Sequence, residues 1–79
     1  MLYVRIVGPP GPARTRLEDH VRRALEALGL SALVVRSDDI HALAALGFPA
    51  EPVLLVDGRV LASGWVPEPE DVVDLLPGS

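Results

Sequence analysis

The stretch Gly8-Pro9-Pro10-Gly11-Pro12 constrains the fold of this 79-residue chain most strongly, because it can form neither a helix nor a strand. It separates an apolar run at residues 2–7, which favours a central strand, from a segment whose apolar residues recur with helical spacing. Pro12 suits the first position of that helix. A competing start is Thr15, which forms a T-x-x-E capping box with Glu18. The chain therefore begins as a strand, a rigid bend and an amphipathic helix.

Further glycines, prolines and capping residues divide the remaining sequence into short elements. The first helix is predicted to run to Leu28, with Gly29 just beyond its end. Asp57-Gly58 is the two-residue sequence that most strongly favours a β-hairpin. We therefore expect strands at 30–36, 53–56 and 59–63, a short helix at 39–46 ended by Gly47, and a last helix that begins near Pro69 and stops at Pro77-Gly78.

The resulting order β-α-β-α-β-β-α predicts an α/β fold. Right-handed crossovers make the first two strands parallel neighbours, whereas the hairpin makes the last two antiparallel. The strands are apolar on both sides, so helices must cover both faces of the sheet. We expect a single domain over residues 1–79, with a four-stranded mixed sheet in the middle of three layers.

The composition argues against several classes of protein. The chain contains no cysteine, so a disulfide framework is impossible, and its net charge of −4 argues against general nucleic-acid binding. No segment approaches the roughly 18 uninterrupted apolar residues of a membrane span, and the start lacks a signal-peptide pattern. We therefore expect a cytoplasmic protein that binds neither membrane nor nucleic acid.

The polar inventory is unusual for so short a chain. All seven basic residues are arginine, lysine, asparagine and glutamine are absent, and eight prolines are present. Few thermolabile residues and proline-rich loops fit a heat-adapted protein. A GC-rich genome explains the preference for arginine equally well.

Several motifs follow one another in the order and spacing of a known family. They are the pair Leu17-Glu18, then Glu51-Pro52, Val56-Asp57-Gly58 and Gly64-Trp65-Val66-Pro67. Over nearly its whole length the chain resembles the small thioredoxin- and glutaredoxin-like family of redox-active disulfide proteins. That family carries a C-x-x-C at the start of its first helix. Counting back from Leu17-Glu18 places Gly11 and Arg14 at the two cysteine positions, and Glu51 replaces the usual threonine.

The missing cysteines exclude thiol–disulfide exchange, which needs a thiolate nucleophile and a second sulfur. Gly11 has no side chain, and the guanidinium of Arg14 does not deprotonate. We therefore expect a thioredoxin-like protein that is redox-inactive and is not an enzyme, with no catalytic residues and no cofactor.

The resemblance also implies a binding groove. It predicts a cis peptide bond before Pro52 and a backbone at Glu51 that faces the Gly11 turn, where the family pairs with an extended peptide or glutathione. The alternative is a proline that only shapes its loop. Trp65, as the only tryptophan, is either part of a flat apolar patch for a partner or folded onto its own domain. The candidate groove comprises Pro10, Gly11, Pro12, Arg14, Glu51, Pro52, Gly64 and Trp65.

Charged residues offer weaker candidates. Arg14 and Arg16 lie where a helix N-terminus binds anions, but the neighbouring prolines lack N–H groups, and solvated arginines beside Glu18 and Asp19 are the simpler interpretation. Asp38, Asp39 and His41 are close in sequence. One of these aspartates is needed to cap the short helix and no further ligand clusters with them, so we expect no metal site.

Three functions remain open. The first is a non-catalytic module that binds a protein or peptide in the groove beside Pro52. The second is a thiol-independent enzyme or binder of glutathione or another small anionic thiol compound. The third is a structural subunit of a larger assembly. A homodimer formed through an exposed strand edge is also possible for so small a chain.

Overall fold

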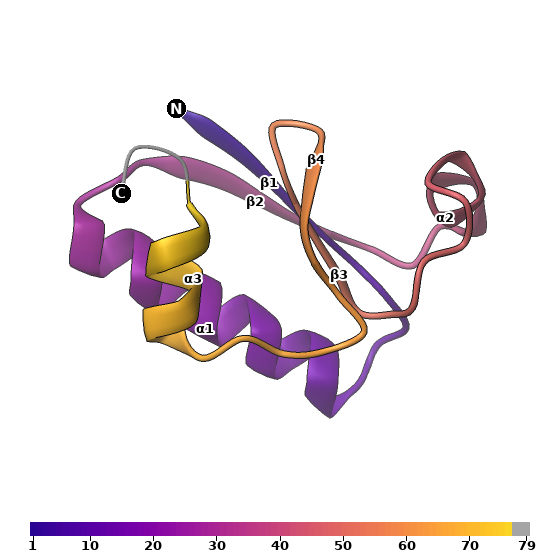
Figure 1. Ribbon diagram of the computed structural model, residues 1–79, viewed down its shortest axis with the longest axis horizontal. Helices are drawn as coiled ribbons and strands as arrows, with labels where there is room; N and C mark the ends of the chain where they lie inside the picture. The colour runs from indigo at the N-terminus through magenta and orange to yellow at the C-terminus, as the bar shows by residue number, and fades with distance from the viewer. Residues whose placement is uncertain (77–79) are drawn as a thin grey trace.

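The computed structural model of the protein describes residues 1–76 and contains helices and strands in the predicted order (Figure 1). The predicted second strand begins two residues later than expected, at Ala32 rather than residue 30. The predicted stop of the last helix at Pro77-Gly78 lies outside the described residues. The elements are β1 (Leu2–Val7), α1 (Pro12–Leu28), β2 (Ala32–Ser37), α2 (Ile40–Ala45), β3 (Val53–Val56), β4 (Arg59–Ser63) and α3 (Pro69–Leu75).

The strands form one mixed sheet in the order β2-β1-β3-β4, which confirms the predicted α/β class. β1 runs parallel to β2, as expected, and antiparallel to β3, which pairs with β4 in the predicted hairpin. The hairpin turn also holds the start of β1. The Asp57 carboxylate accepts a hydrogen bond from the Tyr3 N–H at 2.9 Å, and the Asp57 N–H donates to the Tyr3 carbonyl at 2.8 Å. β1 is therefore central and hydrogen-bonded on both sides.

The main core lies between the sheet and the helices α1 and α3, which pack side by side (Figure 1). The predicted apolar stripe of α1 faces this core. α1 is 17 residues long, and neither it nor any other helix within residues 1–76 is long and apolar enough to cross a membrane. The buried core residues are Val4, Ile6, Leu17, Val21, Ala24, Leu25, Leu54, Val56, Ala62, Val72 and Leu76.

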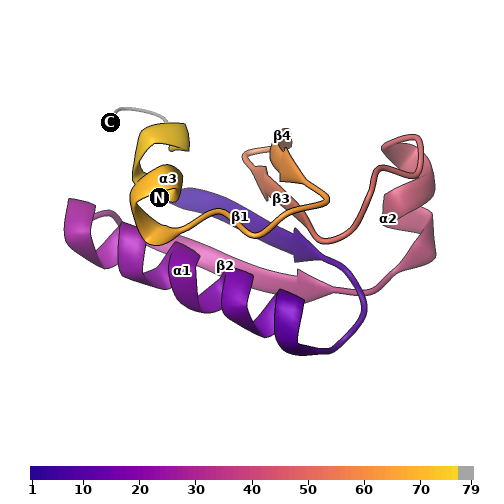
Figure 2. The same cartoon turned by 60° about the horizontal axis from the view of Figure 1, so that its bottom comes forward.

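The second face of the sheet is covered only at one end. Leu43 and Leu46 from the α2 region pack there on Val7, Val53 and Leu55. Figures 1 and 2 show α2 at that end of the sheet, apart from α1 and α3. A strand of six residues is about 20 Å long, whereas a helix of six residues covers only about 10 Å in any direction. The three predicted layers are thus present, but the expectation that helices cover the whole of both faces is met only in part.

The ends of α1 follow the glycine and proline signals. The helix starts at Pro12, and the Thr15 N–H donates to the Gly11 carbonyl at 3.1 Å, so the alternative start at Thr15 was wrong. Glu18 cannot complete a capping box because its carboxylate pairs with Arg22 at 2.9 Å and with Arg36 of β2 at 3.3 Å. At the other end Gly29 adopts the left-handed conformation expected of a helix terminator.

One polar contact ties α1 to the segment before α3, and a second one caps the start of α3. His20 Nδ1 lies 2.8 Å from the carbonyl oxygen of Pro67, which is buried, so α1 is tied to the segment before α3. α3 itself begins with a capping box, in which the Glu68 N–H donates to the Asp71 carboxylate at 3.2 Å and Pro69 takes the first turn. The first turn of this helix carries the acidic residues Glu70 and Asp71, as suits a helix N-terminus.

Truncating a leucine should destabilise the protein much more on the first face of the sheet than on the second face. Leu54 is fully buried in the main core, whereas Leu33 is 53% exposed on the second face. Leu54→Ala should lower the free energy of unfolding by about 2–5 kcal/mol, because it leaves a cavity. Leu33→Ala should cost under about 1 kcal/mol. Urea unfolding monitored by circular dichroism measures both changes, and similar losses in the two variants would show that the second face is packed as tightly as the first.

Candidate binding site beside Pro52

Strand pairing brings the proline-rich bend and the loop before β3 together. Because β1 and β3 are antiparallel with Val7 opposite Val53, the residue that follows β1 lies beside the residue that precedes β3. Gly8 is buried, and a Cβ atom placed on it would lie 3.5 Å from the Cα atom of Pro52. The two segments therefore share one surface, as predicted from the sequence.

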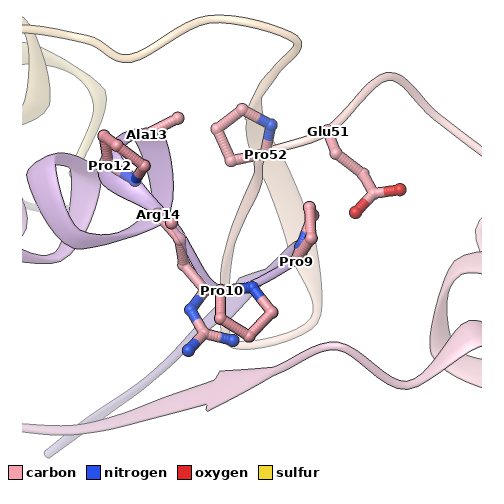
Figure 3. Close-up of a pocket in the computed structure, with 8 residues that line it drawn as sticks. Pro9, Pro10, Pro12, Ala13, Arg14, Glu51 and Pro52 are labelled. Atoms are coloured by element: carbon pink, nitrogen blue, oxygen red, sulfur yellow. The ribbon is translucent and has the colours of Figure 1, made fainter.

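A cavity of about 250 Å³ opens between these two segments. Figure 3 shows proline rings from both of them around it. Six of the eight predicted groove residues line the cavity, and Pro9 and Ala13 were not predicted. The position of Pro9 directly before Pro10 in the bend was the available signal for Pro9, and the position of Ala13 directly after Pro12 was the signal for Ala13. The lining residues are Pro9, Pro10, Gly11, Pro12, Ala13, Arg14, Glu51 and Pro52.

Gly64 and Trp65 do not line this cavity. Gly64 instead contacts the backbone of the site, since its N–H donates to the Pro52 carbonyl at 3.0 Å. Trp65 is 48% exposed, which is intermediate between an open patch and a side chain folded onto the domain. The structure thus unites the two loops of the predicted groove and leaves Trp65 outside its lining.

Arg14 and Glu51 contribute the charges at the cavity. Arg14 Nη1 donates to the Gly8 carbonyl at 3.2 Å, so the guanidinium is directed partly at the backbone of the bend. Neither residue forms an ion pair within residues 1–76. The predicted partners of the helix-start arginines are used elsewhere, since Glu18 pairs with Arg22 and Arg36 and Asp19 pairs with Arg23.

The backbone of Glu51 has unused hydrogen-bonding groups. The peptide bond from Glu51 to Pro52 is cis, as the sequence comparison implied. The carbonyl of Ala50 accepts from the Ser63 hydroxyl at 2.6 Å, and the carbonyl of Pro52 accepts from Gly64. Between them, the N–H and the carbonyl of Glu51 have no hydrogen-bond partner among the described residues. The backbone of Glu51 therefore offers one free donor and one free acceptor among the residues that line the cavity.

A metal ion finds no ready ligand set here. The described part of the chain contains no cluster of three histidine, cysteine, aspartate or glutamate side chains. Asp39 serves instead as the cap of α2, where its carboxylate accepts from the His41 N–H at 2.9 Å.

Comparison with known proteins shows which family this chain belongs to. Residues 2–77 match the sequence profile of a family described as "Thioredoxin domain". The chain belongs to the thioredoxin-domain family. It is also 28% identical over 76 residues to a protein named "Thioredoxin" from Methanocaldococcus jannaschii, covering 96% of this chain and 87% of that protein. The thioredoxin domain of this chain lacks the thiols that disulfide exchange requires, because the sequence contains no cysteine.

Restoring the two cysteines tests whether only the sulfur atoms are missing. A Cβ atom at Gly11 would meet nothing within 4 Å, although the φ of 159° at this residue is one that a residue with a side chain adopts only with strain. The double variant Gly11→Cys with Arg14→Cys places thiols at a helix N-terminus, which favours the thiolate. We expect it to form an internal disulfide and to reduce insulin with dithiothreitol, whereas the parent chain gives the uncatalysed rate. Free thiols that persist under oxidising conditions would show that the bend has lost the geometry for this reaction.

Gly64 and Gly58 form a matched pair for testing the support behind Pro52. Both have a left-handed backbone, with φ of 82° and 83°, but only a Cβ at Gly64 meets a neighbour, the Ala50 Cβ at 2.9 Å. Gly58→Ala should cost about 1 kcal/mol from backbone strain, and Gly64→Ala about 2–3 kcal/mol because the loop must also shift. Equal losses on chemical unfolding would mean that the Ala50 contact is loose.

Proposed function

We propose that this thioredoxin-domain protein is a redox-inactive module that binds an extended peptide segment in the cavity beside Pro52. The observation that carries this proposal is the free N–H and carbonyl pair of Glu51 among the residues that line the cavity. An extended peptide offers a matching carbonyl and N–H on one edge of its backbone. It can therefore pair with Glu51 in the manner of strand addition.

The size and lining of the cavity suit one side chain of a peptide better than a whole small-molecule ligand. A volume of about 250 Å³ lies at or below the lower end of the usual range for small-molecule sites, roughly 300–1,000 Å³. Four of the eight lining residues are prolines, which offer apolar contact and no N–H donors. One apolar side chain of a peptide can fill such a space while the peptide backbone pairs with Glu51.

A small anionic thiol compound such as glutathione is the second candidate. The Arg14 guanidinium at the cavity favours it, because this cation has no carboxylate partner within residues 1–76. The exposed carboxylate of Glu51 at the same cavity opposes it. The site thus carries one positive and one negative side chain among apolar ones. A mainly apolar peptide segment therefore suits it better than a small anion does.

Filling the cavity separates binding there from binding elsewhere. Ala13 is exposed, lines the cavity and lies in the first turn of α1, whereas Ala27 is an exposed alanine in the last turn of the same helix. Peptides selected on the parent protein from a random-sequence display library should lose at least about tenfold in affinity with Ala13→Trp, since the indole occupies the space of the bound side chain. Fluorescence anisotropy of the labelled peptides measures this loss.

The control variant Ala27→Trp should bind the same peptides as the parent protein. Selected peptides that tolerate Ala13→Trp, or a selection that returns no binder, would contradict the peptide proposal. A rise in melting temperature with glutathione that Ala13→Trp removes would assign the cavity to the second candidate.

A further inference from the structure

The half of the second sheet face that α2 leaves uncovered is an apolar surface. Tyr3, Leu33 and Val60 are 42%, 53% and 46% exposed there. The strand register places Tyr3 beside Leu33, and it places Arg5 between Val35 and Leu55, which in turn lies beside Val60. We call the five residues Tyr3, Arg5, Leu33, Val35 and Val60 the open strip. None of them lines the cavity beside Pro52.

The open strip has the size of a single helix. About 10 Å of strand length remains once α2 has covered its end, and a helix with its side chains is about 10–12 Å wide. Across the sheet, four strands at about 4.8 Å spacing offer about 14–19 Å, the length of roughly ten to thirteen helical residues. A second helix beside α2 would complete the third layer of the fold.

The centre of the open strip holds a cation without a partner. Arg5 is half-buried between Val35 and Leu55, and its guanidinium forms no hydrogen bond or ion pair within the described residues. By contrast, Arg22, Arg23 and Arg36 each pair with a carboxylate. Asp57 stands opposite Tyr3, but its carboxylate accepts the Tyr3 N–H at 2.9 Å and does not reach Arg5.

We propose that the open strip binds an amphipathic helix of another protein, one that presents aliphatic side chains with a single carboxylate among them. The aliphatic side chains would cover Tyr3, Leu33 and Val60. The carboxylate would pair with Arg5, which is the charge complement that the strip requires. Recognition would follow the helix-in-groove mode, in which side chains at i, i+3, i+4 and i+7 provide the contacts.

A second copy of this chain fits the open strip less well. Face-to-face packing about a two-fold axis would bring the two Arg5 side chains toward each other in an apolar interface, which is unfavourable. The open strip measures roughly 10 Å by 14–19 Å, which gives an area of about 140–190 Å². A stable protein dimer buries roughly 800 Å² of surface on each partner, which is much more. A single helix needs a smaller surface and supplies the missing negative charge.

Two designed peptides test the proposal on the intact protein. Each has about fourteen residues, with leucines at i, i+3, i+4 and i+7, and they differ only in a glutamate or a glutamine in the middle of the leucine face. Nuclear magnetic resonance titration of isotope-labelled protein should show the amides of Tyr3, Leu33 and Val60 shifting with the glutamate peptide. The glutamine peptide should bind about tenfold more weakly, because it lacks the ionised partner for Arg5.

Variants of the protein make the result decisive. Arg5→Met should bind both peptides with equal affinity, and Leu33→Asp should bind neither. Leu30→Asp is the matched control, because Leu30 is 39% exposed beside α1 rather than on the second face, and it should bind as the parent chain does. Equal affinity of the two peptides for the parent protein, or no shift up to about 1 mM peptide, would overturn the proposal. A homodimer of the free protein that Leu33→Asp dissociates would also overturn the proposal, because a second copy of the chain would then occupy the open strip.

Discussion

The antiparallel pairing of β1 with β3 is the contact on which the rest of the site depends. It sets Val7 opposite Val53, and this register alone brings the bend after β1 against the loop before β3. The same central strand pairs with β2 on its other side, so it also organises both faces of the sheet. One face receives α1 and α3 and becomes the main core, whereas the other receives only the short α2. The cavity and the open strip are therefore two outcomes of one strand arrangement.

Residues that restrict the backbone made most of the fold predictable. Proline and glycine fix where an element cannot continue, and the helix start at Pro12, the helix end at Gly29 and the hairpin at Asp57-Gly58 all follow from that local restriction. The capping box of Thr15 and Glu18 failed because α1 already begins at Pro12 and Glu18 pairs with Arg22 one turn further along the helix. Glu18 also pairs with Arg36 on β2, a residue that no local pattern connects to it.

The candidate site was predictable in its loops and less so in its surroundings. The order of the motifs predicted the fold, and that fold pairs β1 with β3. This pairing brings the Gly11 bend against Pro52. Trp65 follows β4, and where its side chain lies relative to the cavity depends on the path of the chain across the sheet, which no short motif specifies. The extent of the uncovered face was hidden for a similar reason. A continuous run of apolar residues shows that both faces of a strand avoid water, but not how far a six-residue helix can shield one of them.

The proline wall of the cavity gives this site a mechanical character of its own. Pro9, Pro10, Pro12 and Pro52 each have a ring that locks the φ angle and leaves the side chain almost no torsional freedom. Flexible side chains around a site must be frozen when a guest arrives, and that ordering weakens association. Rings cannot be frozen further. Under the proposed function, the proline part of the lining would therefore lose little side-chain freedom when a peptide binds, and it would select peptides by the fit of their side chains.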